Sequence, residues 1–145
     1  MIRTGLTAAA LLAAGQAAAL SCVRPDLARS FNEAAASEKQ YVVLYGTFDF
    51  DLRKLPQVGW DRQQDTKPDN PIRAKFIGES LSRQGFVPSA ISGMTLNAQC
   101  FRPWCAAIAT DTPYLAFVEK TGDSYTLAIS PCGGFAFVTP NPGPA

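Results

Sequence analysis

The chain contains no histidine. Histidine is the commonest general base in enzymes, so its absence excludes Ser-His and Cys-His nucleophilic arrangements. Zinc sites usually combine thiolates with imidazoles at close spacing, whereas Cys22 stands far from the other cysteines of this chain. A phosphate-binding loop is also missing, because Gly133-Gly134 is not followed by a Lys-Ser/Thr pair. We therefore expect no metal, no cofactor and no enzymatic activity.

The chain also lacks an excess of charge and a long apolar run. Its 13 basic and 12 acidic residues give a formal net charge of +1, and like charges are not grouped in blocks. This balance argues against binding to nucleic acid or to a charged membrane surface. The apolar stretch over residues 6–20 is interrupted by a Gly-Gln pair and is shorter than the roughly 20 residues of a spanning helix.

The first part of the chain predicts export. Residues 1–19 have the basic Arg3 near their start, an Ala/Leu stretch and a small-residue end, which is typical of a secretory signal peptide. Cleavage before Leu20 and cleavage before Cys22 both satisfy the small-x-small rule. An uncleaved anchor and a lipid-modified Cys22 are the alternatives. We expect a periplasmic or secreted monomer with no transmembrane segment after the signal peptide is removed.

Four cysteines are present, and they are expected to pair in an oxidising compartment. Three pairings are possible. A short turn that contains proline separates Cys100 from Cys105, which favours a local bridge and leaves Cys22 to pair with Cys132. A redox role for the local pair is not expected, because its four-residue gap differs from the two-residue gap of thioredoxin-type motifs.

Residue patterns predict one helix and a series of strands. Apolar residues at helical spacing behind Pro25 predict a helix over residues 25–37. Runs rich in β-branched and aromatic residues, separated by turn residues, predict strands over 41–50, 72–82, 91–99, 114–119, 124–130 and 135–138.

The segments between these strands contain proline and glycine. We expect a bulge or bend at Gly78 and a turn at residues 85–88. Residues 51–71 are expected to form a long polar loop, and the proline-rich residues 139–145 a disordered tail.

Short strands at regular spacing are typical of small barrels and sandwiches. We predict a mainly β fold: a small five-stranded antiparallel barrel of the oligonucleotide/oligosaccharide-binding (OB) type with one N-terminal helix. It would form a single disulfide-linked domain over residues 20–138. A small β-sandwich is the alternative.

Exposed aromatic residues are the best candidates for a binding site. Trp60 lies within the polar loop, and Phe101, Arg102 and Trp104 lie on the turn that a Cys100–Cys105 bridge would close. Aromatic and arginine side chains on rigid loops are typical of recognition patches. The alternative role for Trp104 is structural, with its ring packed on the bridge at one end of the barrel.

Carboxylates provide the other candidate chemistry. Asp49 and Asp51 lie two positions apart, a spacing that places both side chains on one face of a strand end, where a small hydrolase would use them. Together with Asp61 they would be candidate calcium ligands, but their pattern lacks the regular spacing of calcium loops. We expect them to be solvated loop residues.

The arrangement resembles the netrin-like domain, a family that includes the tissue inhibitors of metalloproteinases. Cys22-Val23-Arg24-Pro25 is similar to the Cys-Val-Pro-Pro opening of that family. Phe31 and the strand at 41–48 match its first helix and strand, and residues 115–132 match its late hairpin that ends in a cysteine. The resemblance implies an exported five-stranded barrel stapled by disulfides.

The chain departs from the inhibitors at one position. In the inhibitors, a cysteine two residues before the one matching Cys22 starts the mature chain, and its amine and carbonyl chelate the protease zinc. Here that position is Leu20, which cannot form the anchoring disulfide. We therefore expect an exported non-catalytic binding module that recognises a protein or a cell-envelope component. Metalloprotease inhibition and a small hydrolase activity are the alternatives.

Overall fold

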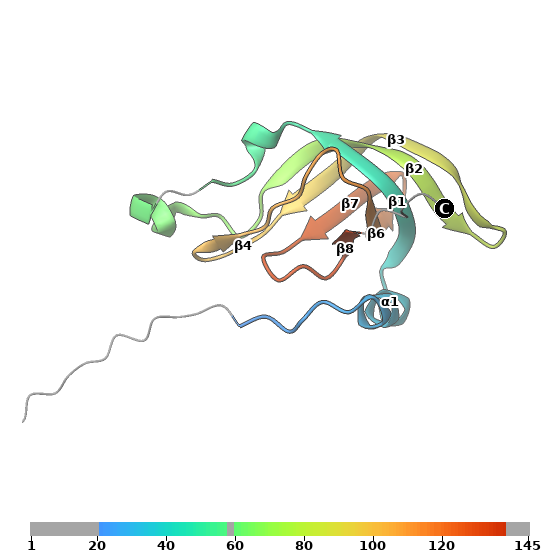
Figure 1. The fold of residues 1–145 in the computed structure, drawn as a ribbon, viewed down its shortest axis with the longest axis horizontal. Coiled ribbons are helices and arrows are strands. Elements are labelled where there is room, and N and C mark those ends of the chain that lie inside the picture. The colour runs from blue at the N-terminus through green and yellow to red at the C-terminus, as the bar shows by residue number, and fades with distance from the viewer. Residues whose placement is uncertain (1–20, 58–59, 139–145) are drawn as a thin grey trace, which may run out of the picture.

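The structure is a computed structural model that describes residues 21–57 and 60–138. The predicted signal peptide and the predicted tail lie outside the described residues. Figure 1 shows a β-barrel with one helix beside it. The elements are α1 (Leu27–Ala36), β1 (Gln40–Phe50), the short 3₁₀ helices η1 (Leu52–Lys54) and η2 (Trp60–Asp65), β2 (Pro71–Ser82), β3 (Gly85–Ala98), β4 (Cys100–Phe101), β5 (Trp104–Cys105), β6 (Tyr114–Thr121), β7 (Ser124–Ile129) and β8 (Ala136–Val138).

Five strands close the barrel in the order β1-β2-β3-β7-β6, and β6 returns to β1. Leu44 on β1 lies opposite Ser80 of β2 on one side and opposite Ala116 of β6 on the other. The short strand β8 pairs with the first residues of β6, 114–116, whereas β7 pairs with its last residues, 119–121. This is the mainly β, OB-like barrel with one helix that the sequence predicts.

The expectation of an entirely antiparallel sheet is wrong at one pair of strands. β3 and β7 run parallel over four residue pairs, from Thr95–Thr126 to Ala98–Ile129, and the other pairs of the barrel are antiparallel. The reason is geometric. Strand direction cannot alternate all the way around a closed ring with an odd number of strands, so one neighbouring pair must be parallel.

Alternation along the strands fills the barrel. Every second residue of the central strands points inward, and the largest fully buried side chains are those of Phe48, Phe76, Leu44, Leu96, Leu127 and Val118. Tyr114 closes one end of this core, where its hydroxyl accepts a hydrogen bond from the backbone N–H of Ala109 at 2.9 Å.

Two local expectations about β2 and β3 are wrong. Gly78 is not a bulge: it lies directly opposite Gly46 of β1, and a side chain at either position would overlap the backbone of the other strand. The register shift instead falls in β3, where Ser92 and Gly93 lie opposite the single residue Lys75. Residues 85–88 are not a turn but the first part of β3, and the turn lies one step earlier, at residues 83–84.

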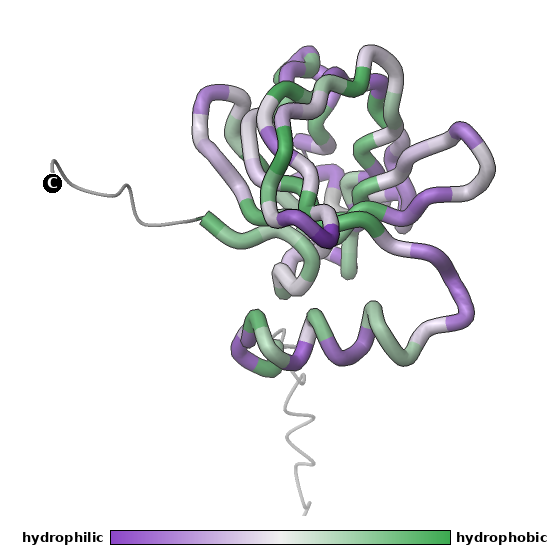
Figure 2. The backbone as a smooth tube through the Cα atoms, turned by 90° about the vertical axis from the view of Figure 1, so that its right-hand side faces the viewer, coloured by the Kyte–Doolittle hydropathy of each residue, from purple (hydrophilic) through white to green (hydrophobic). Residues whose placement is uncertain are grey.

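Helix α1 begins where Asp26 caps it. The Asp26 carboxylate accepts hydrogen bonds from the backbone N–H groups of Ala28 at 2.8 Å and of Arg29 at 3.3 Å. Figures 1 and 2 show α1 lying by itself on one side of the barrel. Among the described residues, no helix is long and apolar enough to cross a membrane.

Two disulfides join Cys22 to Cys132 and Cys100 to Cys105, which is the pairing that the spacing favours. The first connects the segment before α1 to the segment before β8. The second closes the β4–β5 hairpin.

Candidate functional site

The β4–β5 hairpin presents an aromatic pair to solvent. Cys100 lies opposite Cys105 and Phe101 lies opposite Trp104, so the two rings share one face of the hairpin and the disulfide lies on the other. The exposed fraction is 43% for Phe101 and 48% for Trp104. Both rings are thus about half exposed, and together they form an aromatic patch that solvent reaches. We call this surface the hairpin face.

Arg102 extends the hairpin face. It lies in the turn between the two short strands, is exposed, and forms no ion pair with any residue that the structure describes. Its guanidinium therefore remains available for a ligand. Three of the four binding residues predicted from the sequence, Phe101, Arg102 and Trp104, thus lie together.

The fourth predicted residue, Trp60, begins the 3₁₀ helix η2 in the long loop. Its side chain lies outside what the structure describes, so its relation to the hairpin face is not defined. The long polar loop predicted for residues 51–71 contains the two short helical segments η1 and η2, and its last residue, Pro71, begins β2.

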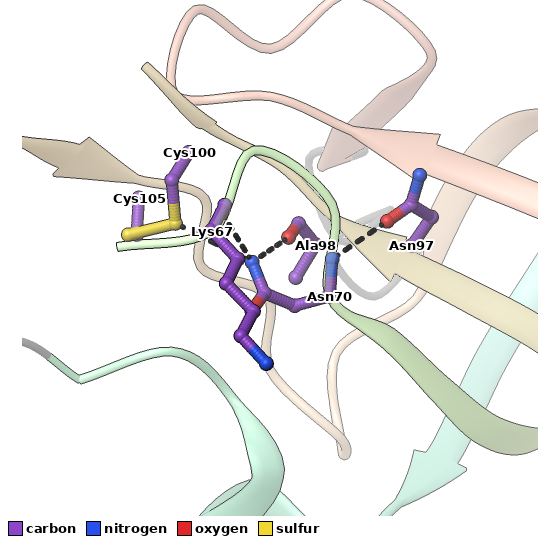
Figure 3. The surroundings of a disulfide bond; sticks show 6 residues. All are labelled: Lys67, Asn70, Asn97, Ala98, Cys100 and Cys105. Atoms are coloured by element: carbon purple, nitrogen blue, oxygen red, sulfur yellow. Dashed lines mark hydrogen bonds between the residues drawn. A yellow bond between two sulfur atoms is a disulfide. The ribbon is translucent and has the colours of Figure 1, made fainter. Parts of the chain in front are cut away.

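The base of the hairpin is held by Asn70, as Figure 3 shows. Its side-chain amide donates hydrogen bonds to the carbonyl oxygens of Lys67 and Ala98, both at 2.9 Å, and lies 3.6 Å from the Cys100 sulfur. Its backbone N–H donates to the Asn97 side chain at 3.0 Å. The hairpin is thus fixed at its base by the disulfide and by a side chain from the end of the long loop.

A cavity of about 320 Å³ lies beside the hairpin, between the outer wall of the barrel, the end of α1 and the segment before β8. We call it the hairpin cavity. Phe101 of the hairpin face lines it, and three further rings, those of Tyr41, Phe117 and Phe135, complete its aromatic walls. The hairpin face and the hairpin cavity are therefore one continuous surface.

The aromatic walls are held by ring contacts. Tyr41 and Phe135 stack with their centroids 5.5 Å apart, and Phe117 meets Phe135 edge-on at 6.2 Å. Phe31 of α1 and Phe137 of β8 cover the remaining sides of Phe117, at 6.3 and 6.4 Å. Phe117 is consequently only 2% exposed although it points out of the barrel. These five residues form the outer aromatic cluster.

Charged groups lie at the edge of the hairpin cavity. Lys39 and Glu119 form an ion pair with 3.6 Å between nitrogen and oxygen, and their side chains are 63% and 30% exposed. Glu33 of α1 also lines the cavity and has no ion-pair partner among the described residues. The cavity lining therefore carries two carboxylates and one ammonium group.

Of the four aromatic residues that line this cavity, the sequence predicts only Phe101 as a site residue. Tyr41, Phe117 and Phe135 come from β1, β6 and the segment before β8. The pairing of β1 with β6 and the hydrogen bond from the Phe117 N–H to the Phe135 carbonyl at 2.8 Å bring them together. One indication was available: Phe117 occupies an outward-facing position of β6, where a solvated strand would carry a polar residue.

The candidate carboxylates Asp49 and Asp51 line one open hollow together with Arg73 and Lys75. Asp51 caps η1 and holds Arg53 through two side-chain hydrogen bonds of 3.0 Å. The Arg53 guanidinium lowers the pKa of Asp51 below its ordinary value, chiefly through hydrogen bonding. Asp49 is exposed and lies opposite Lys75 in the sheet. Across the described ranges, no group of three or more His, Cys, Asp or Glu side chains could hold a metal ion.

A second hollow lies against another part of α1 and shares the ring of Phe117 with the hairpin cavity. It has a volume of about 370 Å³ and is lined almost entirely by apolar side chains, among them those of Leu27, Phe31, Leu81 and Phe86. We call it the apolar groove. Leu81 and Phe86 belong to the tip of the β2–β3 hairpin and do not contribute to the hairpin cavity.

Comparison with protein-family models, with curated proteins and with solved structures finds no match. The netrin-like resemblance therefore stays a prediction. The zinc-chelating arrangement of the inhibitors cannot be compared, because position 20 lies outside the described residues.

Proposed function

We propose that this protein is an exported, non-catalytic binding module that recognises another protein through the hairpin face. The observation that carries the proposal is the exposed pair of Phe101 and Trp104 on a hairpin that a disulfide closes. Large rings and arginine dominate the binding energy of protein interfaces, and rigid presentation reduces the entropy lost on binding. Arg102 beside the rings adds the third typical residue type.

A protein partner is favoured over a component of the cell envelope. The rings of the hairpin face are about half exposed on a two-stranded hairpin, whereas a small-molecule site buries most of its ligand in a concavity. The hairpin face also adjoins a cavity, so a partner that covers the face would place part of its own surface inside the hairpin cavity. Such a combination of a protruding aromatic pair and a neighbouring hollow suits a folded or extended polypeptide.

The two disulfides support the export part of this proposal, because such bonds need an oxidising environment to form and persist. A non-reducing peptide map of the protein isolated from its native cell tests it directly. We expect a chain that lacks residues 1–19 and contains two bridges. A protein that retains those residues and has four free thiols would overturn the export part of the proposal.

Binding is tested with the purified protein immobilised and exposed to an extract of the cell envelope and secreted fraction. Each retained protein is then purified and titrated. We expect at least one protein with saturable binding, and we expect the double variant F101A/W104A to weaken that binding by roughly tenfold or more.

The double variant L81A/F86A, which removes two apolar side chains of similar exposure from the apolar groove, is the matched control and should bind like the wild type. Loss of binding in the control but not in the hairpin variant would place the site on the wrong surface. Retention of a glycan or another non-protein component in place of a protein would overturn the choice of partner. Both variants must first unfold at the same urea concentration as the wild type.

A further inference from the structure

We propose that the hairpin cavity takes the cationic head of an arginine or lysine side chain from the protein partner. The inference rests on the proposed function only in naming a protein as the source of that side chain. It concerns the concave part of the surface, whereas the proposed function rests on the exposed rings of the hairpin.

Aromatic rings form the walls that such a group needs. Tyr41, Phe101, Phe117 and Phe135 all line the cavity. A guanidinium or ammonium group is attracted electrostatically to the face of an aromatic ring, and this attraction offsets part of its desolvation cost, which an aliphatic pocket cannot do. Phe101 both lines the cavity and is partly exposed, so an incoming side chain can contact it from the hairpin face.

The charge of the cavity selects a cation. Glu33 and Glu119 contribute two negative charges and Lys39 contributes one positive charge, so the lining carries a net charge of −1. An anionic side chain would meet this charge unfavourably, and an uncharged apolar one would leave Glu33 unpaired at a protein interface. An arginine or lysine head satisfies both the rings and the unpaired Glu33.

Lys39 lines the cavity and already pairs with one of its two carboxylates. Its ammonium group lies 3.6 Å from Glu119, and its side chain is mostly exposed, so the pair is weak and easily opened. Lys39 is therefore an internal competitor of the partner's cation. Its removal should strengthen binding, whereas removal of a carboxylate should weaken it.

The test uses capped tripeptides as probes and amide chemical shifts of the full protein as the readout. Acetyl-Gly-Arg-Gly-amide is compared with the same peptide containing norleucine or glutamate in place of arginine. We expect the arginine peptide to shift the amide signals of Gly133 and Gly134, which line the cavity, in a saturable way. The norleucine and glutamate peptides should not do so. Binding should weaken as sodium chloride is added.

Three variants should change the affinity for the arginine peptide, one of them upward and two of them downward. K39Q should raise the affinity for the arginine peptide by roughly twofold to fivefold, since it removes the competing surface ion pair. E33Q should lower it, and Y41L should lower it by about the same factor through loss of a ring. L81A is the control, because Leu81 lines the apolar groove and not this cavity.

Two results would overturn the inference: equal binding of all three peptides, or a K39Q variant that weakens arginine binding. Neither result depends on the native partner. If the arginine peptide fails but a protein partner still needs Phe101 and Trp104, the subsite is wrong and the proposed function stands. If the arginine peptide binds but no partner needs the hairpin face, the proposed function is wrong and the cation subsite stands.

Discussion

The ring of Phe31 on α1 lies edge-on against the ring of Phe117 on β6, with 6.3 Å between their centroids. Phe117 faces away from the barrel interior and is nevertheless buried, because Phe31 and the segment around Phe135 cover it. The protein therefore has a second apolar layer outside its barrel. This layer positions α1 and forms one wall of the hairpin cavity.

Phe117 should consequently contribute as much to stability as a residue of the barrel core. We expect F117A to lower the free energy of unfolding by about 3–5 kcal/mol, the usual range for a buried phenylalanine. F31A should cost only about 1 kcal/mol, because that ring is half exposed and loses mainly the edge-on contact. Urea unfolding of both variants measures the difference. Equal losses would show that Phe117 is not covered as described.

The two disulfides should differ in their contributions. Cys22–Cys132 closes a loop with a sequence separation of 110 residues, and Cys100–Cys105 closes one with a separation of 5. Chain-entropy reasoning gives a loss of about 5 kcal/mol for C22A/C132A and about 2 kcal/mol for C100A/C105A. Thermal or urea unfolding of the two double variants tests the order. The opposite order would mean that the local bridge stabilises chiefly through contacts in the folded state.

Asn70 should control the base of the hairpin. N70A leaves the carbonyl groups of Lys67 and Ala98 without their side-chain donor, which should lower the free energy of unfolding by about 2 kcal/mol. The backbone N–H of Cys100, which donates to Pro68 at 3.0 Å, should then exchange faster with solvent. N70D preserves the shape but removes the donor, so it should behave like N70A. A wild-type exchange rate in N70D would contradict this assignment.

Gly46 should tolerate no side chain. A Cβ atom there would overlap the carbonyl oxygen of Ile77 and lie 2.8 Å from the Cα atom of Gly78, so strands β1 and β2 would have to move apart. We expect G46A to lower the free energy of unfolding by about 3 kcal/mol. G93A is the matched control, because its Cβ would meet only the flexible end of Arg73 at 3.3 Å. G93A should change stability by less than about 1 kcal/mol.

The ion pair between Asp51 and Arg53 should make a pH-dependent contribution. The pKa of Asp51 is lowered, so the folded state is stabilised above the pKa of the unfolded chain, and this stabilisation is lost as the pH falls through the lowered value. In R53Q the pKa of Asp51 should rise toward its ordinary value, as measured by NMR titration of the carboxyl carbon. K54Q should shift it less, since Lys54 acts only through its charge. An unchanged pKa in R53Q would contradict the pair.

Much of the fold could be predicted from local sequence patterns. The helix expected at 25–37 is observed at Leu27–Ala36, and its start is displaced because Asp26 provides the cap. The strands follow from alternation and β-branched residues. The parallel β3–β7 pair could not be read from local patterns, because it is a consequence of closing an odd number of strands. The bulge at Ser92-Gly93 arises in the same way, from the pairing of β3 with β2.

The residues of the candidate site also fall into those that local sequence predicts and those that it does not. Phe101, Arg102 and Trp104 could be predicted as an exposed group because six consecutive residues and their disulfide define the hairpin. The hairpin cavity could not, because Tyr41 and Phe135 lie almost a hundred residues apart and meet only through long-range packing. Local patterns thus predict the protruding part of the surface, and the hollow beside it requires the assembled barrel.

The bridge between Cys22 and Cys132 turns most of the described chain into a closed covalent ring. A single proteolytic cut in the long loop between β1 and β2 would therefore open the ring without releasing a fragment. Both pieces would stay attached until the bridge is reduced, and each would still hold part of the barrel. In an environment that contains proteases, the chain can be cut once in this loop while the two pieces stay covalently joined.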